Sequence, residues 1–430
     1  MIHAARAMSV ALTLAFVFGC NGGDNPSSST NNPLPGSTAP DNPSAPPVPI
    51  ADDGGGSASP TPAPEPVEDP GPPAVQIIGR TDNRDSNGPV LGWPGVRIIA
   101  NVQDAPSISV RMNETVLDSG PSEYDVAIDD QWNDIESPLI LTAGDNTYTL
   151  ASNLSPGTHK VEIYRRSEGQ NGTTQFLGFD FAGGTLLPPP LHLKRKIEIV
   201  GDSDVSGFGY MGSITGTCLP GPDWSAHNAN YRQAWGERLA QKLQAESNAT
   251  VFSGKGFYYN IWRPDLEVIG ILYPRSNPVD PSAIFDLNTY TPDAVVVSLG
   301  GNDYNEGQGC TSSTPNCDPG PAPLDGFTQK VRELTDTIRT QYPQTSIFLM
   351  AYAVLTDAYP PGYGRRTNVE TGLRTVVDEH NAAGDAKVYF VDPTPSTDDE
   401  LTACDGHGDA EYHERIAVYM ADQMASKLSW

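Results

Sequence analysis

The stretch that decides the fold of this chain is IEIVGDSDVSGFGY, residues 197–210. Its first residues are strand-like, and they run directly into Gly-Asp-Ser and then into a segment rich in glycine. Asp and Ser also favour turns and helix caps, so this tripeptide alone fits an ordinary turn equally well. The rest of the chain has to decide between such a turn and a nucleophilic Ser203.

From Lys194 onward, strand-like apolar runs alternate with helical periodicity. Strands are expected at residues 197–200, 250–252, 294–299, 346–350 and 387–391, and helices between them, for example at 231–245 and 327–340. Continuous apolar strands joined by helices predict an α/β domain, in which a parallel sheet has helices on both faces. Such a sheet places ligands at the carboxyl ends of its strands, where Ser203 falls.

Three further polar blocks follow in chain order. SGKG (253–256) follows the second expected strand, LGGNDY (299–304) ends the third, and CDGHGDAEYHERIA (404–417) carries His407 just before a helix. A serine nucleophile, a histidine base and N–H donors for an oxyanion are the groups that acyl transfer requires. The sequence therefore predicts a serine hydrolase.

These blocks resemble those of the SGNH (GDSL-type) hydrolases, which are named for the Ser, Gly, Asn and His residues. Matched motif by motif, the resemblance makes Ser203 the nucleophile and His407 the base. It also implies an oxyanion hole formed by the backbone N–H of Ser203, by Gly254 and by the side-chain amide of Asn302.

The chain is similar, from residue 77 to 430, to carbohydrate esterase family 2, whose members are acetylxylan esterase-like. The local similarities are IGRTD (78–82), GTHKVEI (157–163), RKIEIVGDS (195–203) and SGKG. The similarity implies a jelly-roll domain before a flavodoxin-like SGNH domain, with no metal and no cofactor. It also implies removal of acetyl groups from plant cell-wall polysaccharides such as xylan and mannan-type chains, including glucomannan.

The last block departs from the usual SGNH pattern. An Asp commonly stands three residues before the histidine and a Pro follows it, whereas Cys404 and Gly408 occupy these positions here. Asp405 is the natural alternative partner for the imidazole, and a backbone carbonyl is another; either would fix the tautomer. A Ser203–His407–Asp405 triad and a Ser–His dyad are therefore both open.

Two more residues near the blocks have open roles. His413 is a rival base, but it falls about one turn inside a helix that begins near Asp409, where a partly exposed structural histidine is favoured. Asp204 either points away from Ser203 as a first-turn helix charge or faces the cleft. In the cleft it would raise the pKa of the histidine and repel anionic substrates.

Before the α/β domain, the pattern over residues 73–190 is one of short period-two runs such as VRIIANV, SISVRMN and HKVEIYRR. Turn signals separate these runs at regular spacing, which predicts an all-β sandwich or jelly-roll domain. The catalytic domain is then expected over residues 191–430.

The first 20 residues predict an exported protein. The apolar run over residues 8–18 is too short to span a membrane and fits a signal peptide, and VFGC (17–20) resembles a bacterial lipobox despite the bulky Phe18. Cys20 would then carry a lipid anchor to the membrane, with ordinary secretion as the alternative. Residues 21–72, rich in Pro, Ser and Gly, are expected to be a disordered linker.

Composition limits the classes of molecule that this chain is expected to bind. The formal net charge of -27 and a sequence pI near 4.4 argue against nucleic acid, because a nucleic-acid binder needs clustered Lys and Arg. The chain lacks CxxC pairs and His clusters with metal-ligand spacing, which argues against zinc. The expected partner is an acetylated polysaccharide or oligosaccharide, bound by a monomer.

Without Cys20, four cysteines remain in an oxidising context, and they permit three pairings. We favour Cys310 with Cys317, which closes a short loop, and Cys218 with Cys404. The second disulfide would pin the histidine loop to the segment that follows the nucleophile.

The leading functional hypothesis is an esterase that deacetylates polysaccharides through an acetyl-serine intermediate. One alternative keeps this chemistry but changes the acyl ester, for example to lipids or to peptidoglycan O-acetyl groups. Another is a carbohydrate-binding surface protein with a degenerate second domain, which the presence of all four block residues disfavours.

Overall fold

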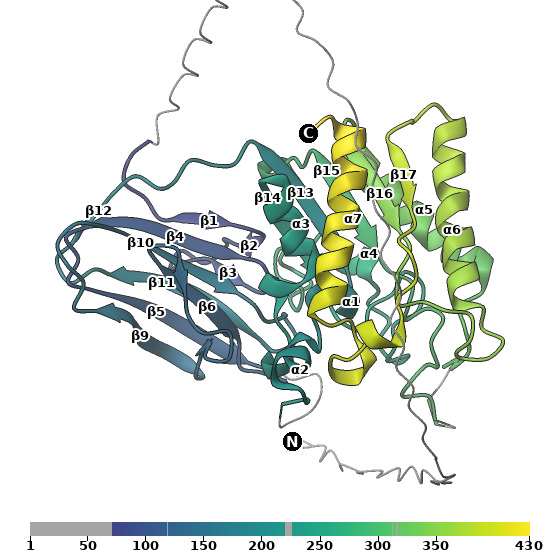
Figure 1. The fold of residues 1–430 in the computed structure, drawn as a ribbon, viewed down its shortest axis with the longest axis horizontal. Helices are drawn as coiled ribbons and strands as arrows, with labels where there is room; N and C mark the ends of the chain where they lie inside the picture. The colour runs from purple at the N-terminus through teal and green to yellow at the C-terminus, as the bar shows by residue number, and fades with distance from the viewer. Residues whose placement is uncertain (1–70, 118, 220–225, 312, 315–316) are drawn as a thin grey trace, which may run out of the picture. The chain divides into compact units, whose positions relative to one another are not determined.

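The computed structural model describes residues 71–430, apart from residues 118, 220–225, 312 and 315–316. The expected signal peptide, the lipobox and nearly all of the expected linker lie outside the described residues. The described chain has a β domain followed by an α/β domain, and the two belong to one compact unit (Figure 1). The order of elements is thus the one that the sequence predicts.

The β domain is a sandwich of two antiparallel sheets. One sheet has the strand order β1-β4-β10-β6-β7, with β12 beside β4 and β8 beside β6, and the other has the order β2-β3-β11-β5-β9. Alternate residues of the long strands point into the sandwich, and their side chains are buried. The strands of the first sheet are β1 (Gln76–Ile78), β4 (Arg97–Gln103), β6 (Glu123–Ile128), β7 (Gln131–Trp132), β8 (Leu139–Ile140), β10 (Thr158–Arg165) and β12 (Thr185–Leu186). Those of the second are β2 (Thr81–Asp82), β3 (Val90–Leu91), β5 (Ser107–Val116), β9 (Gly144–Ser152) and β11 (Gly172–Asp180).

The α/β domain contains a parallel sheet in the order β14-β13-β15-β16-β17. Its strands are β13 (Arg195–Gly201), β14 (Ala245–Val251), β15 (Ala294–Ser298), β16 (Ser346–Met350) and β17 (Val388–Val391). Gly201 at the end of β13 pairs with Val251 of β14 and with Ser298 of β15. Because the three strands end level, the segments that follow them emerge at the same edge of the sheet.

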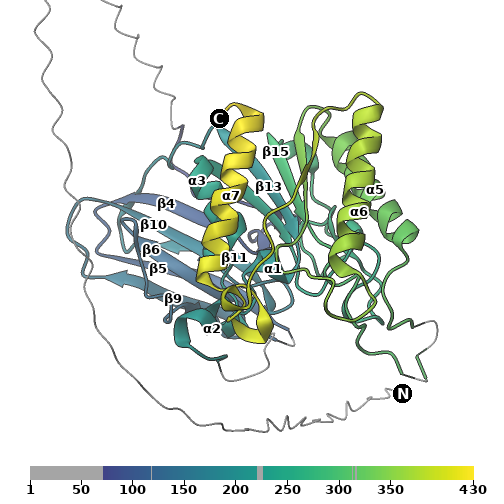
Figure 2. The ribbon, with the colours of Figure 1, turned by 45° about the vertical axis from the view of Figure 1, so that its right-hand side comes forward.

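Helices cover both faces of this sheet (Figure 2). On one face, α3 (Trp235–Leu243) packs against α7 (Ala410–Leu428), and both contribute to a core with alternate residues of β13 and β15. On the other face, α4 (Ile269–Leu272), α5 (Leu324–Gln341) and α6 (Arg365–Ala382) share a second core with the remaining strand residues. The strands are therefore buried on both sides, as their apolar sequences predict.

One strand and one helix differ from expectation. The second strand begins at Ala245, five residues before the expected run, and the helix before it is shortened to α3 after a 3-10 turn at Tyr231–Gln233. All seven residues of β14 are buried although its sequence, AESNATV, is polar. Polar partners allow this burial: the Ser247 hydroxyl donates to Glu237 and the Thr250 hydroxyl donates to Glu198, each at 3.0 Å.

The two domains share a buried interface that contains ion pairs. Arg80 of the β domain pairs with Glu198 of β13, and both side chains are fully buried. Arg97 of β4 pairs with Glu237 of α3, whose carboxylate is also fully buried. Removing one partner of such a pair would leave an uncompensated buried charge, so these pairs hold the domains in one arrangement.

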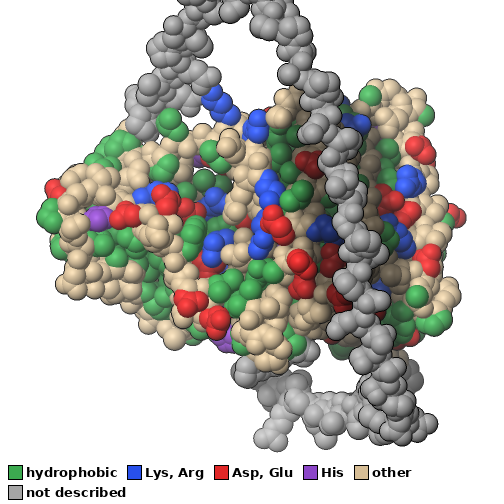
Figure 3. Space-filling model, viewed as in Figure 1, with side chains coloured by type: hydrophobic (Ala, Val, Ile, Leu, Met, Phe, Trp, Pro, Cys, Tyr) green, Lys and Arg blue, Asp and Glu red, His purple; other side chains and the backbone are tan. Residues whose placement is uncertain are grey.

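Both expected disulfides are confirmed. Cys218 is bonded to Cys404 and Cys310 to Cys317, with Cα–Cα distances of 5.2 and 5.4 Å. Among the described helices, none combines the length and the apolar character that a membrane crossing needs. On the described atoms of the face drawn in Figure 3, acidic and basic side chains are interspersed.

Candidate active site

Ser203 stands at the carboxyl edge of the parallel sheet. It is the first residue of the short helix α1 (Ser203–Ser206), which follows β13 after Asp202. Asp202 caps this helix by accepting the N–H of Asp204 at 3.2 Å. The Gly-Asp-Ser tripeptide thus caps helix α1 and also places Ser203 at the sheet edge.

His407 meets this serine across 204 residues of sequence. Its Nε2 lies 2.9 Å from Oγ of Ser203. Its other ring nitrogen, Nδ1, lies 3.2 Å from the backbone carbonyl oxygen of Cys404. If that nitrogen carries the proton, Nε2 is left free to accept the serine hydroxyl, which is the tautomer that a general base needs.

Asp405 does not hold the imidazole in this structure. Its backbone is left-handed, with φ of 56°, and its side chain is exposed and makes no hydrogen bond to His407 among the described contacts. Of the two alternatives that the sequence leaves open, the geometry favours the dyad with a backbone carbonyl. Asp405 still acts at longer range, because its negative charge opposes the lowering of the His407 pKa by burial.

The glycines of the opening stretch allow the histidine loop to approach closely. Gly209 has φ of 76°, and a Cβ atom there would lie 2.5 Å from the Cys404 carbonyl oxygen. A Cβ atom on Gly212, in α2 (Tyr210–Thr215), would lie 2.7 Å from the Cys404 sulfur. The N–H of Cys404 donates to the carbonyl of Gly209 at 3.1 Å, so the two loops are joined by this hydrogen bond as well as by the disulfide.

Two of the three expected oxyanion donors are available. In the described part of the chain, the backbone N–H groups of Ser203 and Gly254 have no hydrogen-bond acceptor. Asn302 differs: its amide nitrogen already donates to Asp202 Oδ2 at 2.9 Å and to the Lys255 carbonyl at 2.8 Å. Its role in the oxyanion hole therefore stays a prediction that requires one of these hydrogens to be shared.

Asp204 points away from the cleft. Its carboxylate is buried and accepts the hydroxyl of Tyr412 at 2.7 and 2.8 Å. Burial raises the pKa of Asp204 to about 6. Because Tyr412 lies in the first turns of α7, this contact ties the nucleophile turn to the helix that follows His407.

His413, the rival base, is structural. It is buried in α7, and its Nδ1 accepts the backbone N–H of Trp235 at 3.1 Å. Burial lowers its pKa to about 3, so this side chain stays neutral. Its role is the expected one, but it is buried where partial exposure was expected.

Asp303, which follows Asn302 directly, is a residue whose role the sequence reasoning missed. Its buried carboxylate accepts the backbone N–H groups of Phe257, Tyr258 and Tyr259 at 3.0, 2.6 and 2.9 Å. It thereby ties the loop after Gly254 to the loop that carries Asn302. The sequence signal for this role was the position of Asp303 as the last residue of the GGND block.

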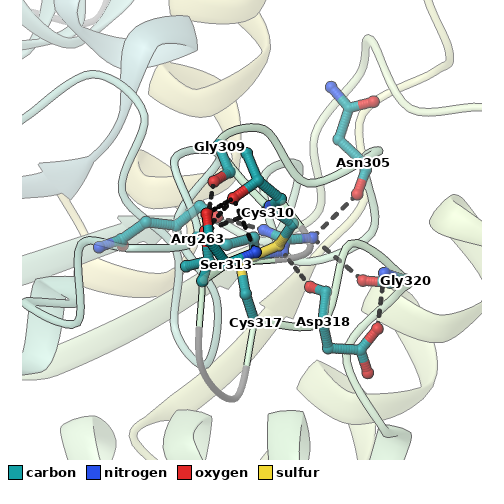
Figure 4. Close-up of a disulfide and its surroundings, with 11 residues drawn as sticks. Arg263, Asn305, Gly309, Cys310, Ser313, Cys317, Asp318 and Gly320 are labelled. Carbon is teal, nitrogen blue, oxygen red and sulfur yellow. Dashed lines mark hydrogen bonds between the residues drawn. A yellow bond between two sulfur atoms is a disulfide. The ribbon is translucent and has the colours of Figure 1, made fainter.

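Arg263 is a second missed residue. Its guanidinium donates to the backbone carbonyls of Asn302 at 3.2 Å, Asn305 at 2.9 Å and Gly320 at 3.1 Å, and its Nε donates to that of Asp318 at 3.1 Å. Figure 4 shows this side chain beside the short-loop disulfide. One buried side chain thus organises a long loop that contains few apolar residues.

Comparisons with known proteins agree with this geometry. Residues 77–190 match the family model for the carbohydrate esterase 2 N-terminal domain, and residues 199–416 match that of the GDSL-like lipase/acylhydrolase family. The cellulase/esterase CelE of Acetivibrio thermocellus is 28% identical over 359 residues, which cover 83% of this chain but only 40% of that protein. An acetylxylan esterase / glucomannan deacetylase of Cellvibrio japonicus is 26% identical over 285 residues, covering 66% of this chain and 72% of that protein.

A solved structure supports the same grouping. A family two carbohydrate esterase from Clostridium thermocellum, in complex with cellohexaose, aligns with a TM-score of 0.72 and 27% identity, over 83% of this chain and all of the other. That alignment spans the β domain and the α/β domain together. The chain therefore belongs to the GDSL-like lipase/acylhydrolase family and, within it, to the family 2 carbohydrate esterases.

Proposed function

We propose that this protein removes O-acetyl groups from cell-wall polysaccharides of the xylan, glucomannan or mannan type. The observation that carries the proposal is the 2.9 Å contact between Ser203 Oγ and His407 Nε2, together with the N–H groups of Ser203 and Gly254, which have no acceptor among the described hydrogen bonds. A nucleophile, a base and oxyanion donors that converge at one sheet edge are suited to ester hydrolysis. The names of the relatives supply the acetyl group and the sugars.

The proposed reaction has two halves. In the first, Ser203 Oγ attacks the acetyl carbonyl carbon while His407 Nε2 takes the hydroxyl proton, and the N–H donors bind the oxyanion. The bond between the carbonyl carbon and the sugar oxygen then breaks, and His407 returns the proton to that oxygen. In the second half, His407 activates water against the acetyl-serine, and acetate and free Ser203 result.

An exposed aromatic side chain near the site supports a carbohydrate substrate. Trp262 is 53% exposed, and the residue before it, Ile261, donates its N–H to the Gly254 carbonyl at 2.8 Å. The indole thus belongs to the residue directly after one that is hydrogen-bonded to Gly254. A flat, exposed aromatic face of this kind is suited to the apolar face of a sugar ring.

The test is acetate release from acetylated xylan and from acetylated glucomannan, compared between the protein and Ser203→Ala. We expect release from at least one polymer and its loss in the variant, with unchanged circular dichroism. Cleavage of a small aryl acetate without release from either polymer would keep the serine esterase and move the substrate to another acyl ester. Binding of the polymers with no hydrolysis of any ester would favour the carbohydrate-binding alternative.

We further propose that the protein is exported and anchored through a lipid on Cys20. Detergent-phase partition of the full chain, compared with Cys20→Ala, tests this anchor. Equal partition of both forms would leave ordinary secretion.

A further inference from the structure

Glu168 belongs to the β domain but touches the α/β domain at its second block. It lies three residues after the end of β10, and it is almost fully buried. Its backbone is held by its own domain, because Arg165 Nη2 donates to its carbonyl at 3.0 Å and its N–H donates to Asn171 Oδ1 at 3.0 Å. The side chain therefore leaves a fixed turn.

Both carboxylate oxygens of Glu168 accept from Ser253, and Oε1 also accepts from the Gln170 side-chain amide at 3.5 Å. Oε2 accepts the Ser253 backbone N–H at 2.6 Å, and Oε1 accepts the Ser253 hydroxyl at 2.5 Å. This two-point contact restrains both the backbone and the side chain of Ser253. The next residue is Gly254, whose N–H has no acceptor among the described hydrogen bonds and is an expected oxyanion donor.

Gly254 is restrained from its other side as well. Its carbonyl accepts the N–H of Ile261 at 2.8 Å, and its φ of 79° is a left-handed value that glycine adopts without strain. A flexible peptide here would have to be ordered in the transition state, whereas a peptide fixed in advance does not. Glu168 and Ile261 thus restrain the donor from opposite ends.

Close hydroxyl contacts lead from Ser253 toward the nucleophile. The Ser253 hydroxyl lies 3.1 Å from that of Ser206, and the Ser206 hydroxyl donates to the Ser203 backbone carbonyl at 3.2 Å. Each hydroxyl carries one proton, and both are used in the bonds to Glu168 and to the Ser203 carbonyl, so the connection of Glu168 to the oxyanion donors is the one to Gly254, through one covalent neighbour.

The contact is held despite an electrostatic cost. No described Lys or Arg forms an ion pair with Glu168, although Arg165 lies close enough to favour its charge. The charge of Glu168 also raises the pKa of Asp202, another buried carboxyl, and burial raises the pKa of Glu168 to about 7. A neutral side chain would fill this position at lower cost.

We infer that Glu168 is a positioning residue for the oxyanion hole, so that the β domain completes the catalytic machinery of the neighbouring domain. This inference rests on the proposed function as a serine esterase, but not on the identity of the sugar. It assigns the β domain a role in the rate of the chemical step, which a separate sugar-binding module would not have.

The test compares Glu168→Leu and Glu168→Gln with the unchanged protein on a small aryl acetate. Glu168→Leu removes both acceptors, and we expect kcat to fall roughly 10- to 100-fold with KM changed less than about threefold, because an oxyanion donor acts mainly in the transition state. Glu168→Gln keeps an acceptor for the Ser253 N–H, so we expect it to recover most of the rate. The rate at which a fluorophosphonate modifies Ser203 should follow the same order.

Glu237 offers a matched control. It is also a buried glutamate at the domain interface, and it also accepts a serine hydroxyl, that of Ser247, yet it contacts none of the four blocks. Glu237→Leu should lower the melting temperature while leaving kcat within about twofold of the unchanged protein.

Two results would overturn the inference. One is a Glu168→Leu variant with normal kcat and normal labelling; the other is an equal loss of kcat in Glu237→Leu, which would make the effect a general loosening of the interface. If Glu168→Leu does not fold, Glu168→Ala replaces it in the test. An unchanged kcat in Glu168→Ala would then refute the inference, and so would a Glu168→Gln variant whose kcat is as low as that of Glu168→Ala. If the fluorophosphonate labels Ser203 of the unchanged protein but neither polysaccharide is deacetylated, the proposed sugars are rejected and this inference stands. If the unchanged protein is not labelled, the proposed function and this inference are both rejected.

Discussion

Replacing Tyr412 by Phe should destabilise the protein by an amount that depends on pH. The variant keeps the buried ring but removes the hydroxyl that donates to both oxygens of Asp204, at 2.7 and 2.8 Å. A hydrogen bond to a charged group contributes about 1.5–3 kcal/mol, so we expect a loss of about 2 kcal/mol at pH 8. At pH 5 the carboxyl is protonated, because its pKa is about 6, and the loss should be about 1 kcal/mol.

The sign follows from linkage. Burial raises the pKa of Asp204 from 3.8 to about 6, so the unfolded chain releases this proton at lower pH than the native protein does. The native state is therefore penalised progressively as pH rises from 3.8 to 6, by about 3 kcal/mol in total. Asp204→Asn lacks this penalty, and its stability relative to the unchanged protein should rise over that range.

Urea unfolding at pH 5 and pH 8, followed by tryptophan fluorescence and by circular dichroism, measures both effects. Coincident transitions by the two probes are required before free energies are compared. The double variant Asp204→Asn/Tyr412→Phe isolates the pair, and its coupling energy should be larger at pH 8. The reasoning is refuted if Tyr412→Phe loses the same stability at both pH values, because the partner would then not be a titrating carboxylate.

Three other perturbations test the site. Asp405→Asn should move the acid limb of the pH–rate profile to lower pH, because it removes a charge that raises the pKa of His407, and should lower kcat less than tenfold; a loss of about 10⁴ would restore the triad. Reduction of Cys218–Cys404 should lower both the melting temperature and kcat, since it frees the histidine loop; an unchanged kcat would remove that role. Burial raises the pKa of Glu168 from 4.5 to about 7, so the native state of the unchanged protein loses stability as pH rises through that range. The free energy of unfolding of Glu168→Gln, measured with urea, should therefore rise relative to that of the unchanged protein by up to about 3 kcal/mol. The same pH dependence in both proteins would contradict this.

The sequence was sufficient for the sheet and for the residues at its edge. Apolar runs identified the central strands, and strands that end level bring together whatever follows them. The pairing of Ser203 with His407 was predicted from the resemblance of the four blocks to those of the SGNH hydrolases. The polar strand β14 was only partly visible, since its burial depends on Glu198 and Glu237, which lie on other elements.

Contacts between distant segments account for what the sequence could not supply. The orientation of Asp204 depends on Tyr412, 208 residues later, and no local rule connects them. Asp405 looked like the orienting carboxylate by spacing, but a left-handed backbone turns it outward and leaves the Cys404 carbonyl facing the ring. Glu168 lies in a turn of the other domain, where its sequence context resembles any exposed loop.

The buried ion pairs between the domains determine what happens when the α/β domain is separated from the β domain. A fragment cut after Pro190 would keep Glu198 and Glu237 but lose Arg80 and Arg97, their arginine partners. Both carboxylates are fully buried in the intact protein. The α/β fragment should therefore be less stable by itself than within the intact chain, and recombination or truncation would have to keep both domains together.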